Sequence, residues 1–315
     1  MRQSTVFGTS EQPIDQTAES YALLAAVNES GPLAVAFSGG VDSAVVLAAG
    51  VRVWGAARTL AVIADSPALA RSELHGARRT AAEIGVELLE VATAEWSVPG
   101  YRENAGNRCY FCKHTVLSRV LEVATERGFG AVATGTHRDD RRAAHRPGLR
   151  AAAELGVVEP LAAAGLGKAE VRGVAVRWGL SVADKPGSPC LSSRVAVGVP
   201  VTPARLGRVE RAEELVRATL TAHGVPVDAL RVRVLATAFR IELGPTTHHW
   251  LDRHPRVQAE VLRAVAAATR LRDGSVAAYR AGAVATASGP GGADAAPTPR
   301  RPADGRPATR GERPA

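Results

Sequence analysis

Three cysteines are placed where they could bind a metal or carry out redox chemistry. Cys109 and Cys112 form a C-x-x-C pair at a predicted helix start, and Cys190 lies in the turn-rich segment 184–194. Three thiolates can hold three irons of a [4Fe–4S] cluster and leave the fourth iron open, or hold structural zinc with His114 as a fourth ligand. They can also be unrelated core residues, because free cysteine is often buried. The spacing leaves all three interpretations open.

A second stretch, Ser38-Gly39-Gly40-Val41-Asp42-Ser43, has the composition of an anion-binding turn. An apolar run at 33–37 precedes it, as in a buried parallel strand, and a helix-favouring run at 44–49 follows. Glycines between a strand and a helix let backbone N–H groups and the positive helix end point at one anion. The two serines add hydroxyl donors, and the aspartate can accept from amides or reach a metal on a phosphate. The stretch therefore predicts a phosphate-binding loop.

The scaffold that must position these residues alternates between strands and helices. Apolar runs predict strands at 33–37, 59–64, 86–91 and 131–134. Helices are predicted at 18–29, 69–84, 108–127 and 168–178. Segments 95–108 and 141–149 lack periodicity and are predicted to be loops. The alternation predicts an α/β fold with a doubly wound parallel sheet, whose ligands bind at the carboxyl ends of the strands.

The regular alternation of strands and helices ends at about residue 195, which predicts a second, smaller α+β domain. Its predicted elements are a helix at 203–223, strands at 230–235 and 239–243, a helix at 255–270 and a strand at 276–279. We therefore divide the chain into a flexible start (1–18), an α/β domain (19–195), the α+β domain (196–281) and a tail (282–315). The tail has almost no large apolar residues and is predicted to be disordered.

The bulk composition narrows the class of protein. With 315 residues and 46% hydrophobic residues, the chain can build about two domains. The net charge of +8 is dispersed, without a basic stripe carrying aromatic residues, so we expect no nucleic-acid partner. No apolar run reaches membrane-span length and the start lacks a secretory pattern, so we expect a cytoplasmic protein that uses no membrane. Cysteines in such a protein favour chemistry or metal binding over disulfides.

Two further sets of residues are candidates for ligand binding. Ser66 follows the second predicted strand and could reach a ligand there, although an ordinary turn serine would look the same. Arg231 and Arg233 are two apart on a predicted strand, so they share one face. Two guanidinium groups on one face make a phosphate clamp, and the alternative is a solvated strand face.

The glycine stretch resembles the pyrophosphate loop of the PP-loop ATPases, which adenylylate a substrate with ATP. It lacks the G-K-[ST] ending of a Walker loop, and the chain lacks the G-x-G-x-x-G dinucleotide pattern. The wider set of motifs resembles the LarE family of ATP-dependent pyridinium-3,5-biscarboxylic acid mononucleotide sulfur transferases, over about residues 20 to 280. These motifs are S-G-G-V-D-S, N-R-C-Y-F-C-K, G-T-H-x-D-D, R-P-G-L-R-A, K-A-E-V-R and D-K-P-G-S-P-C-L-S-S-R.

This resemblance implies a function in nickel-pincer nucleotide cofactor biosynthesis, for lactate racemase maturation. ATP and Mg²⁺ would be used at the glycine stretch and at Gly135, and a carboxylate of the mononucleotide would become a thiocarboxylate. Cys190 matches the sulfur-bearing position. The presence of Cys109 and Cys112 resembles the branch that holds a [4Fe–4S] cluster on three cysteines. The resemblance also implies a homo-oligomer.

The resemblance assigns further residues to the substrate and to a second metal site. Arg231 and Arg233 match phosphate-binding arginines, and Trp96 matches an aromatic residue near the substrate. Arg194 could pair with a phosphate or carboxylate, or it could tie down its own loop. Glu242 and Glu213 match a family metal site, and Glu210 and Glu214 are alternatives to Glu213 on the same helix.

Two other functions remain as alternatives. A PP-loop tRNA thiolase would also combine the glycine stretch with three cysteines, but it would need an RNA-binding surface. A non-catalytic nucleotide-binding protein with structural zinc would need only the fold and the thiols.

Overall fold

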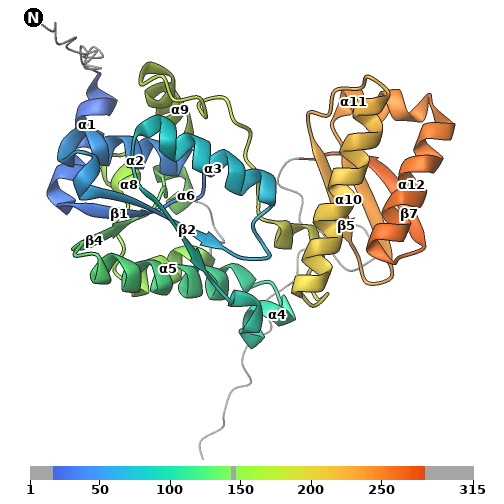
Figure 1. The fold of residues 1–315 in the computed structure, drawn as a ribbon, viewed down its shortest axis with the longest axis horizontal. Coiled ribbons are helices and arrows are strands. Elements are labelled where there is room, and N and C mark those ends of the chain that lie inside the picture. The colour runs from blue at the N-terminus through green and yellow to red at the C-terminus, as the bar shows by residue number, and fades with distance from the viewer. Residues whose placement is uncertain (1–16, 143–146, 281–315) are drawn as a thin grey trace, which may run out of the picture.

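The computed structural model describes residues 17–142 and 147–280. Figure 1 shows a larger α/β lobe that carries the N-terminal half of the chain and a smaller lobe formed by its C-terminal elements. The predicted tail (282–315) and nearly all of the predicted flexible start (1–18) lie outside the described residues. No helix in the described ranges is long and apolar enough to span a lipid bilayer.

The larger lobe is built on a four-stranded parallel sheet in the order β3-β2-β1-β4. The strands are β1 (Leu33–Ala36), β2 (Thr59–Asp65), β3 (Leu88–Ala92) and β4 (Ala131–Ala133). Val35 of β1 is in register with Ala61 of β2 and with Ala133 of β4. The chain moves outward from β1 to β3 and then returns to the other side of β1, so the strand order reverses between β1 and β4. The predicted doubly wound parallel sheet is confirmed.

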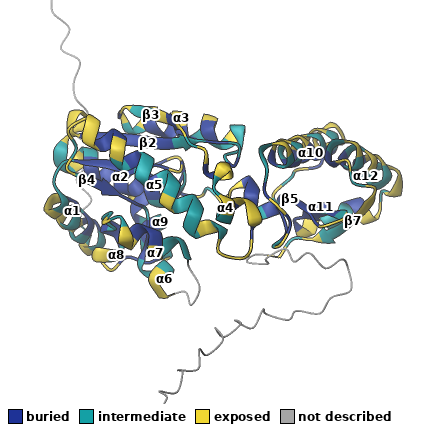
Figure 2. Ribbon diagram, turned by 90° about the horizontal axis from the view of Figure 1, so that it is seen from below, coloured by how far each residue is buried: buried dark blue, intermediate teal, exposed yellow. Residues whose placement is uncertain are grey.

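Helices cover both faces of this sheet. Leu33 and Val35 of β1 face a core that includes α1 (Ala18–Ser30), α2 (Val41–Trp54) and α9 (Lys168–Arg177). Ala34, between them on the strand, faces the opposite core, which is covered mainly by α5 (Arg108–Glu126). α3 (Arg71–Ile84) also packs on the first face. Figure 2 shows β2 largely buried within this lobe, with the more exposed helix α1 at its surface.

Two segments predicted to be loops contain short helices, and these predictions were wrong. Segment 95–108 holds the 3₁₀ turn Glu95–Ser97 and α4 (Pro99–Glu103), and segment 141–149 overlaps α6 (Arg138–Arg142) and α7 (Pro147–Glu154). Helices of one or two turns are too short to display an apolar period. α8 (Pro160–Ala163) and the 3₁₀ turn Ala56–Arg58 complete this lobe.

The smaller lobe packs three helices on a three-stranded mixed sheet. β5 (Leu230–Val234) and β6 (Ala238–Leu243) are antiparallel, and β7 (Asp273–Ala278) is parallel to β6. α10 (Pro203–Ala222) and α12 (Pro255–Thr269) match predicted helices, whereas α11 (Pro245–Asp252) was not predicted. Val216, Ile241 and Val261 lie in its separate core. The predicted smaller α+β unit is therefore present.

A fourth apolar cluster joins the two lobes. Tyr101 of α4 packs there with Leu191 and Val195, which follow Cys190, and with Val234 of β5. Val195 and Val234 also form an isolated parallel bridge. The Cys190 segment, including the 3₁₀ turn Leu191–Arg194, is thus anchored at the joint between the lobes.

Candidate active site

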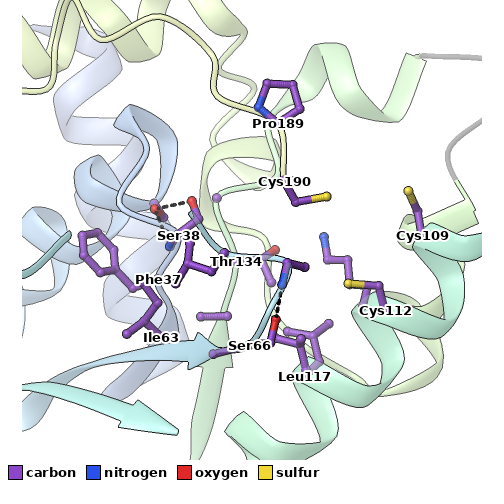
Figure 3. Close-up of a pocket in the computed structure, with 18 of the residues that line it drawn as sticks. Phe37, Ser38, Ile63, Ser66, Cys109, Cys112, Leu117, Thr134, Pro189 and Cys190 are labelled. Atoms are coloured by element: carbon purple, nitrogen blue, oxygen red, sulfur yellow. Dashed lines mark hydrogen bonds between the residues drawn. The ribbon is translucent and has the colours of Figure 1, made fainter. Parts of the chain in front are cut away.

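A cavity of about 500 Å³ opens at the carboxyl ends of the parallel strands. Ser38 follows β1, Ser66 follows β2 and Gly135 follows β4, and all three line it. The reversal of strand order between β1 and β4 leaves a crevice at this point, which is where open α/β sheets bind ligands. Phe37, Ile63 and Leu117 supply apolar wall, and Figure 3 shows them on the side of the pocket away from Cys190.

The glycine stretch folds as a compact loop capped by its own serines. Ser43 Oγ lies 3.1 Å from Ser38 Oγ, and it accepts from the Ser38 amide at 3.2 Å. Gly39 has φ +69°, and a Cβ there would lie 2.9 Å from the Cβ of Ala77, so this position requires glycine. Gly40 caps α2 without a side-chain hydrogen bond, which leaves the first N–H groups of the helix for a ligand. These features suit a phosphate site.

Two lysines that were not predicted as site residues contact this loop. Lys168, the first residue of α9, pairs with the Asp42 carboxylate at 2.6 Å. Lys185 donates to the Gly39 carbonyl at 2.9 Å and pairs with Glu73 at 2.7 Å. Lys168 begins the motif K-A-E-V-R, and Lys185 lies in the motif that starts D-K-P-G. Their contacts with the loop depend on the tertiary structure. They bring positive charge to a site suited to phosphates.

Gly135 allows β4 to approach the start of α2 closely. A Cβ on Gly135 would lie 2.7 Å from the amide nitrogen of Ser43 and 2.9 Å from the carbonyl carbon of Asp42. These are backbone atoms, so the clash could not be relieved by a side-chain rotation. The glycine therefore has a packing reason in addition to its predicted contact with nucleotide.

All three cysteines line the same cavity. Cys109 and Cys112 come from the first turns of α5, and Cys190 comes from the segment that crosses above it. In Figure 3 the sulfur of Cys190 points toward the α5 side of the pocket, where the sulfurs of the other two lie. Residues far apart in the sequence are thus gathered beside the glycine stretch 38–43.

The three thiols do not by themselves form a complete metal-binding site. Burial raises the pKa of Cys112 well above its usual value, and the neighbouring Cys190, Glu95 and Cys109 raise it further. Three thiolates at this place would repel one another without a cation, so the donor set suits a bound metal or cluster. Within the described residues, however, no group of three or more His, Cys, Asp or Glu side chains is gathered closely enough to hold a metal ion.

Ser66 is held by a buried carboxylate that was not predicted. Its hydroxyl donates to Glu95 at 2.5 Å and accepts from the Ala68 amide at 3.2 Å. Glu95 is only 2% exposed, lines the cavity and also accepts from the Thr93 hydroxyl at 2.9 Å. Ser66 is therefore positioned by the protein as well as placed at the cavity.

Arg194 ties down the loop that carries Cys190. Its guanidinium donates to the carbonyls of Pro189 and Cys190, the latter at 3.1 Å, and pairs with buried Glu213 at 2.9 Å. Glu213 also accepts from the Val232 amide of β5 at 3.0 Å. Arg194 was expected either to bind a substrate anion or to hold its own loop, and the structure shows the contacts that hold the loop. Glu213, a predicted metal ligand, is paired with Arg194.

The strand arginines lie beside this loop but differ in surroundings. Arg233 is buried, pairs with Glu242 at 2.9 Å and donates to the Ser193 carbonyl at 2.8 Å. Arg231 donates to the Gly187 carbonyl at 3.4 Å. Burial lowers the pKa of Arg231, and the neighbouring Arg194 lowers it further. The two share one strand face next to the Cys190 segment, as predicted from their spacing.

Trp96 lies apart from these groups. Its side chain is 39% exposed, and it is not among the residues that line the cavity. The neighbouring Glu95 occupies the inward position instead.

Comparison with known proteins identifies the family. No family model matches the chain. An uncharacterised protein of Synechocystis sp. is 39% identical over 211 residues, which cover 67% of this chain and 76% of that protein. The pyridinium-3,5-bisthiocarboxylic acid mononucleotide synthase of Lactiplantibacillus plantarum is 32% identical over 221 residues, which cover 70% of this chain and 78% of the synthase. The chain belongs to the LarE family.

Membership of the LarE family confirms the relationship expected from the motifs. It does not show whether the chain belongs to the branch that holds a [4Fe–4S] cluster on three cysteines. A more distant relative, an uncharacterised protein of Methanocaldococcus jannaschii, is 25% identical over 183 residues. In this LarE family member, one cavity is lined by the glycine stretch 38–43 and by three thiols.

Proposed function

We propose that this protein is an ATP-dependent sulfur transferase that converts a carboxylate of pyridinium-3,5-biscarboxylic acid mononucleotide to a thiocarboxylate, for nickel-pincer cofactor synthesis. The observation that supports this proposal is the shared cavity: Ser38, Asp42 and Ser43 line it together with Cys190. An activating loop and a sulfur nucleophile must reach the same acyl group, and their common cavity allows this. The name of the L. plantarum relative supplies the substrate class.

In the first step, a substrate carboxylate oxygen attacks the α-phosphorus of ATP and pyrophosphate leaves. The loop amides, the start of α2 and the nearby Lys168 and Lys185 would stabilise the leaving pyrophosphate. Asp42 would hold the Mg²⁺ that neutralises it further. This step gives the acyl carbon a good leaving group, AMP, in place of oxide, which is a poor one.

In the second step, sulfur attacks the activated acyl carbon and AMP leaves. Arg194 holds the backbone on both sides of the Pro189–Cys190 bond, so the Cys190 sulfur is kept at the cavity. Cys109, Cys112 and Cys190 would hold a [4Fe–4S] cluster, which when bound would carry an added sulfide for transfer. If Cys190 itself donates the sulfur, its thioester with the substrate would lose the Cα proton and break at the Cβ–Sγ bond. Thiocarboxylate would leave, residue 190 would become dehydroalanine, and the chain mass would fall by one H₂S.

The smaller lobe would bind the phosphate of the mononucleotide. Arg231 is the better candidate of the two strand arginines, because Arg233 is already paired with Glu242. Burial and the neighbouring Arg194 lower the pKa of Arg231, because both disfavour its positive charge. A phosphate bound beside Arg231 would stabilise that charge. Glu213 and Glu242 would have to exchange their arginine partners for a metal ion to form the metal site that the family resemblance implies.

The test is an anaerobic assay with ATP, Mg²⁺, the biscarboxylated mononucleotide and sulfide, read by mass spectrometry. We expect thiocarboxylate, AMP and pyrophosphate from the unaltered chain. Cys190→Ala should lose thiocarboxylate formation and keep pyrophosphate release, while Ser193→Ala in the same segment should keep both.

Three outcomes would count against parts of the proposal. Loss of pyrophosphate release in Cys190→Ala would assign Cys190 a structural role. No pyrophosphate from the unaltered chain would remove ATP activation. Stoichiometric zinc without iron in anaerobically purified protein would exclude the cluster.

A further inference from the structure

We propose that Tyr101 and Asn104 are positioning residues that fix the Cys190 sulfur relative to Cys109 and Cys112. The inference rests on the proposed function, in which these sulfurs act at one place. Both residues lie in the short segment between β3 and α5, immediately before the C-x-x-C pair. This segment was predicted to be an ordinary loop.

Tyr101 reaches the Cys190 segment through its hydroxyl. The side chain is 1% exposed, and its hydroxyl lies 2.5 Å from Ser192 Oγ, two residues after Cys190. Burial raises the pKa of Tyr101, so the hydroxyl stays protonated and can donate. Its ring packs in the apolar cluster that contains Leu191. The contact therefore fixes the turn directly after the thiol.

Asn104 joins the other end of the Cys190 segment to the start of α5. Its side-chain amide, 1% exposed, donates to the Ala196 carbonyl at 2.7 Å and to the Val199 carbonyl at 3.0 Å. Its Oδ1 accepts from Arg108 at 2.6 Å. Arg108 is the first residue of α5 and precedes Cys109. One buried side chain thus ties both thiol-bearing segments together.

The backbone strengthens this connection. The Gly198 amide donates to the Asn104 carbonyl at 2.9 Å, and the Val201 amide donates to the Arg102 carbonyl at 2.8 Å. Asn104 has φ +55°, in the left-handed region, where asparagine is among the few non-glycine residues often found. Asn104 thus adopts an uncommon backbone conformation at the place where its buried side chain contacts the segment that follows Cys190.

Loose positioning of the thiol would be expected to slow the transfer itself. Cys190 is exposed, and the residues before it, 185–189, have no regular structure. Arg194 holds the carbonyls of Pro189 and Cys190, and Tyr101 and Asn104 hold the part of the segment that follows the thiol. Small displacements of a reacting group can reduce a rate strongly, so these contacts should matter for sulfur transfer rather than for adenylylation.

The experiment uses the full chain, freed of metal, without substrate. Tyr101→Phe removes only the hydroxyl, and Asn104→Gly removes the side chain while accepting the left-handed backbone. Tyr110→Phe is the matched tyrosine control, because its hydroxyl bonds Glu154 instead. Arg270→Gly is the matched backbone control at φ +63°.

Two measurements decide the result. Hydrogen exchange of the peptide covering 191–201 should be about fivefold faster in Tyr101→Phe than in the controls, as expected for one lost buried hydrogen bond. It should be faster still in Asn104→Gly, which removes two bonds to this peptide. In a Cys109→Ser background, the rate at which diamide oxidises Cys112 and Cys190 to a disulfide should fall about fivefold. With the substrates present, thiocarboxylate formation should fall while pyrophosphate release stays unchanged.

The inference is overturned if exchange in 191–201 matches the controls, or if it rises equally across the whole chain. An unchanged disulfide rate would also overturn it. If the unaltered chain makes no thiocarboxylate, the proposed function fails, but exchange and disulfide formation still decide the positioning role.

Discussion

Lys168 Nζ lies 2.6 Å and 2.7 Å from the two carboxylate oxygens of Asp42. The pair joins the start of α9 to the glycine stretch 38–43. Asp42 would hold Mg²⁺ in our proposal, and Lys168 could then turn to the phosphates. The ion pair thus joins two groups that a nucleotide would recruit separately in the proposed reaction.

Replacing either member of this pair should impair adenylylation. We expect Lys168→Ala to lower kcat for pyrophosphate release about 100-fold, as for loss of one group that stabilises transition-state charge. Asp42→Ala should abolish it. Arg177→Ala, which removes a cation from the other end of α9, should have little effect. Unchanged pyrophosphate release in Asp42→Ala would mean that the loop does not bind ATP.

Gly135→Ala should disturb the phosphate loop. The new methyl group would meet the backbone of Asp42 and Ser43, so the loop must move. We expect the free energy of unfolding to fall by about 1–3 kcal/mol in urea titrations, and KM for ATP to rise. Gly130→Ala is the control, because a Cβ there meets no atom within 4 Å. Equal effects of the two substitutions would contradict the close approach.

Arg194→Ala should be strongly destabilising. It leaves Glu213 buried without its cation and frees the carbonyls of Pro189 and Cys190. We expect a loss of about 3 kcal/mol in the free energy of unfolding, measured by urea titration. Arg119→Ala breaks an exposed pair with Glu122 and should cost less than about 0.5 kcal/mol. A similar small cost for Arg194→Ala would show that its guanidinium is not tied to Glu213 in solution.

Alkylation of Cys112 should need a higher pH than alkylation of a free thiol. Its pKa is raised by burial and by its neighbours, and the thiolate is the reactive form. We expect the iodoacetamide rate at Cys112 in metal-free protein to increase at higher pH than in the urea-unfolded chain, followed by peptide mass spectrometry. Coinciding pH profiles would rule out the raised pKa.

The same shift predicts a pH dependence of stability. The folded chain keeps the Cys112 proton where the unfolded chain has lost it. The free energy of unfolding should therefore decrease as the pH rises above about 8.5, the ordinary thiol pKa. Cys112→Ser should remove this decrease, and urea titrations at increasing pH would detect it.

Much of the fold could be predicted because its signals are local. The apolar runs that became β1 to β4 are short, continuous and separated by helix-favouring segments. Segment 95–108 was missed because α4 spans only Pro99–Glu103, too short to show a period. The buried roles of Glu95, Tyr101 and Asn104 were missed for a second reason: a polar residue in a short connection looks solvent-exposed until its distant partners are known.

The sequence alone determined the types of chemistry available: a glycine turn between strand and helix, three thiols, and two arginines on one strand face. These follow from residue type and spacing, which act within a few residues. Only the tertiary structure decided which of these groups meet. The return of β4 beside β1 places Gly135 against the phosphate loop, and the packing between the lobes brings Cys190 over α5. Such contacts depend on packing between segments far apart in the chain, so neither spacing nor composition could fix them.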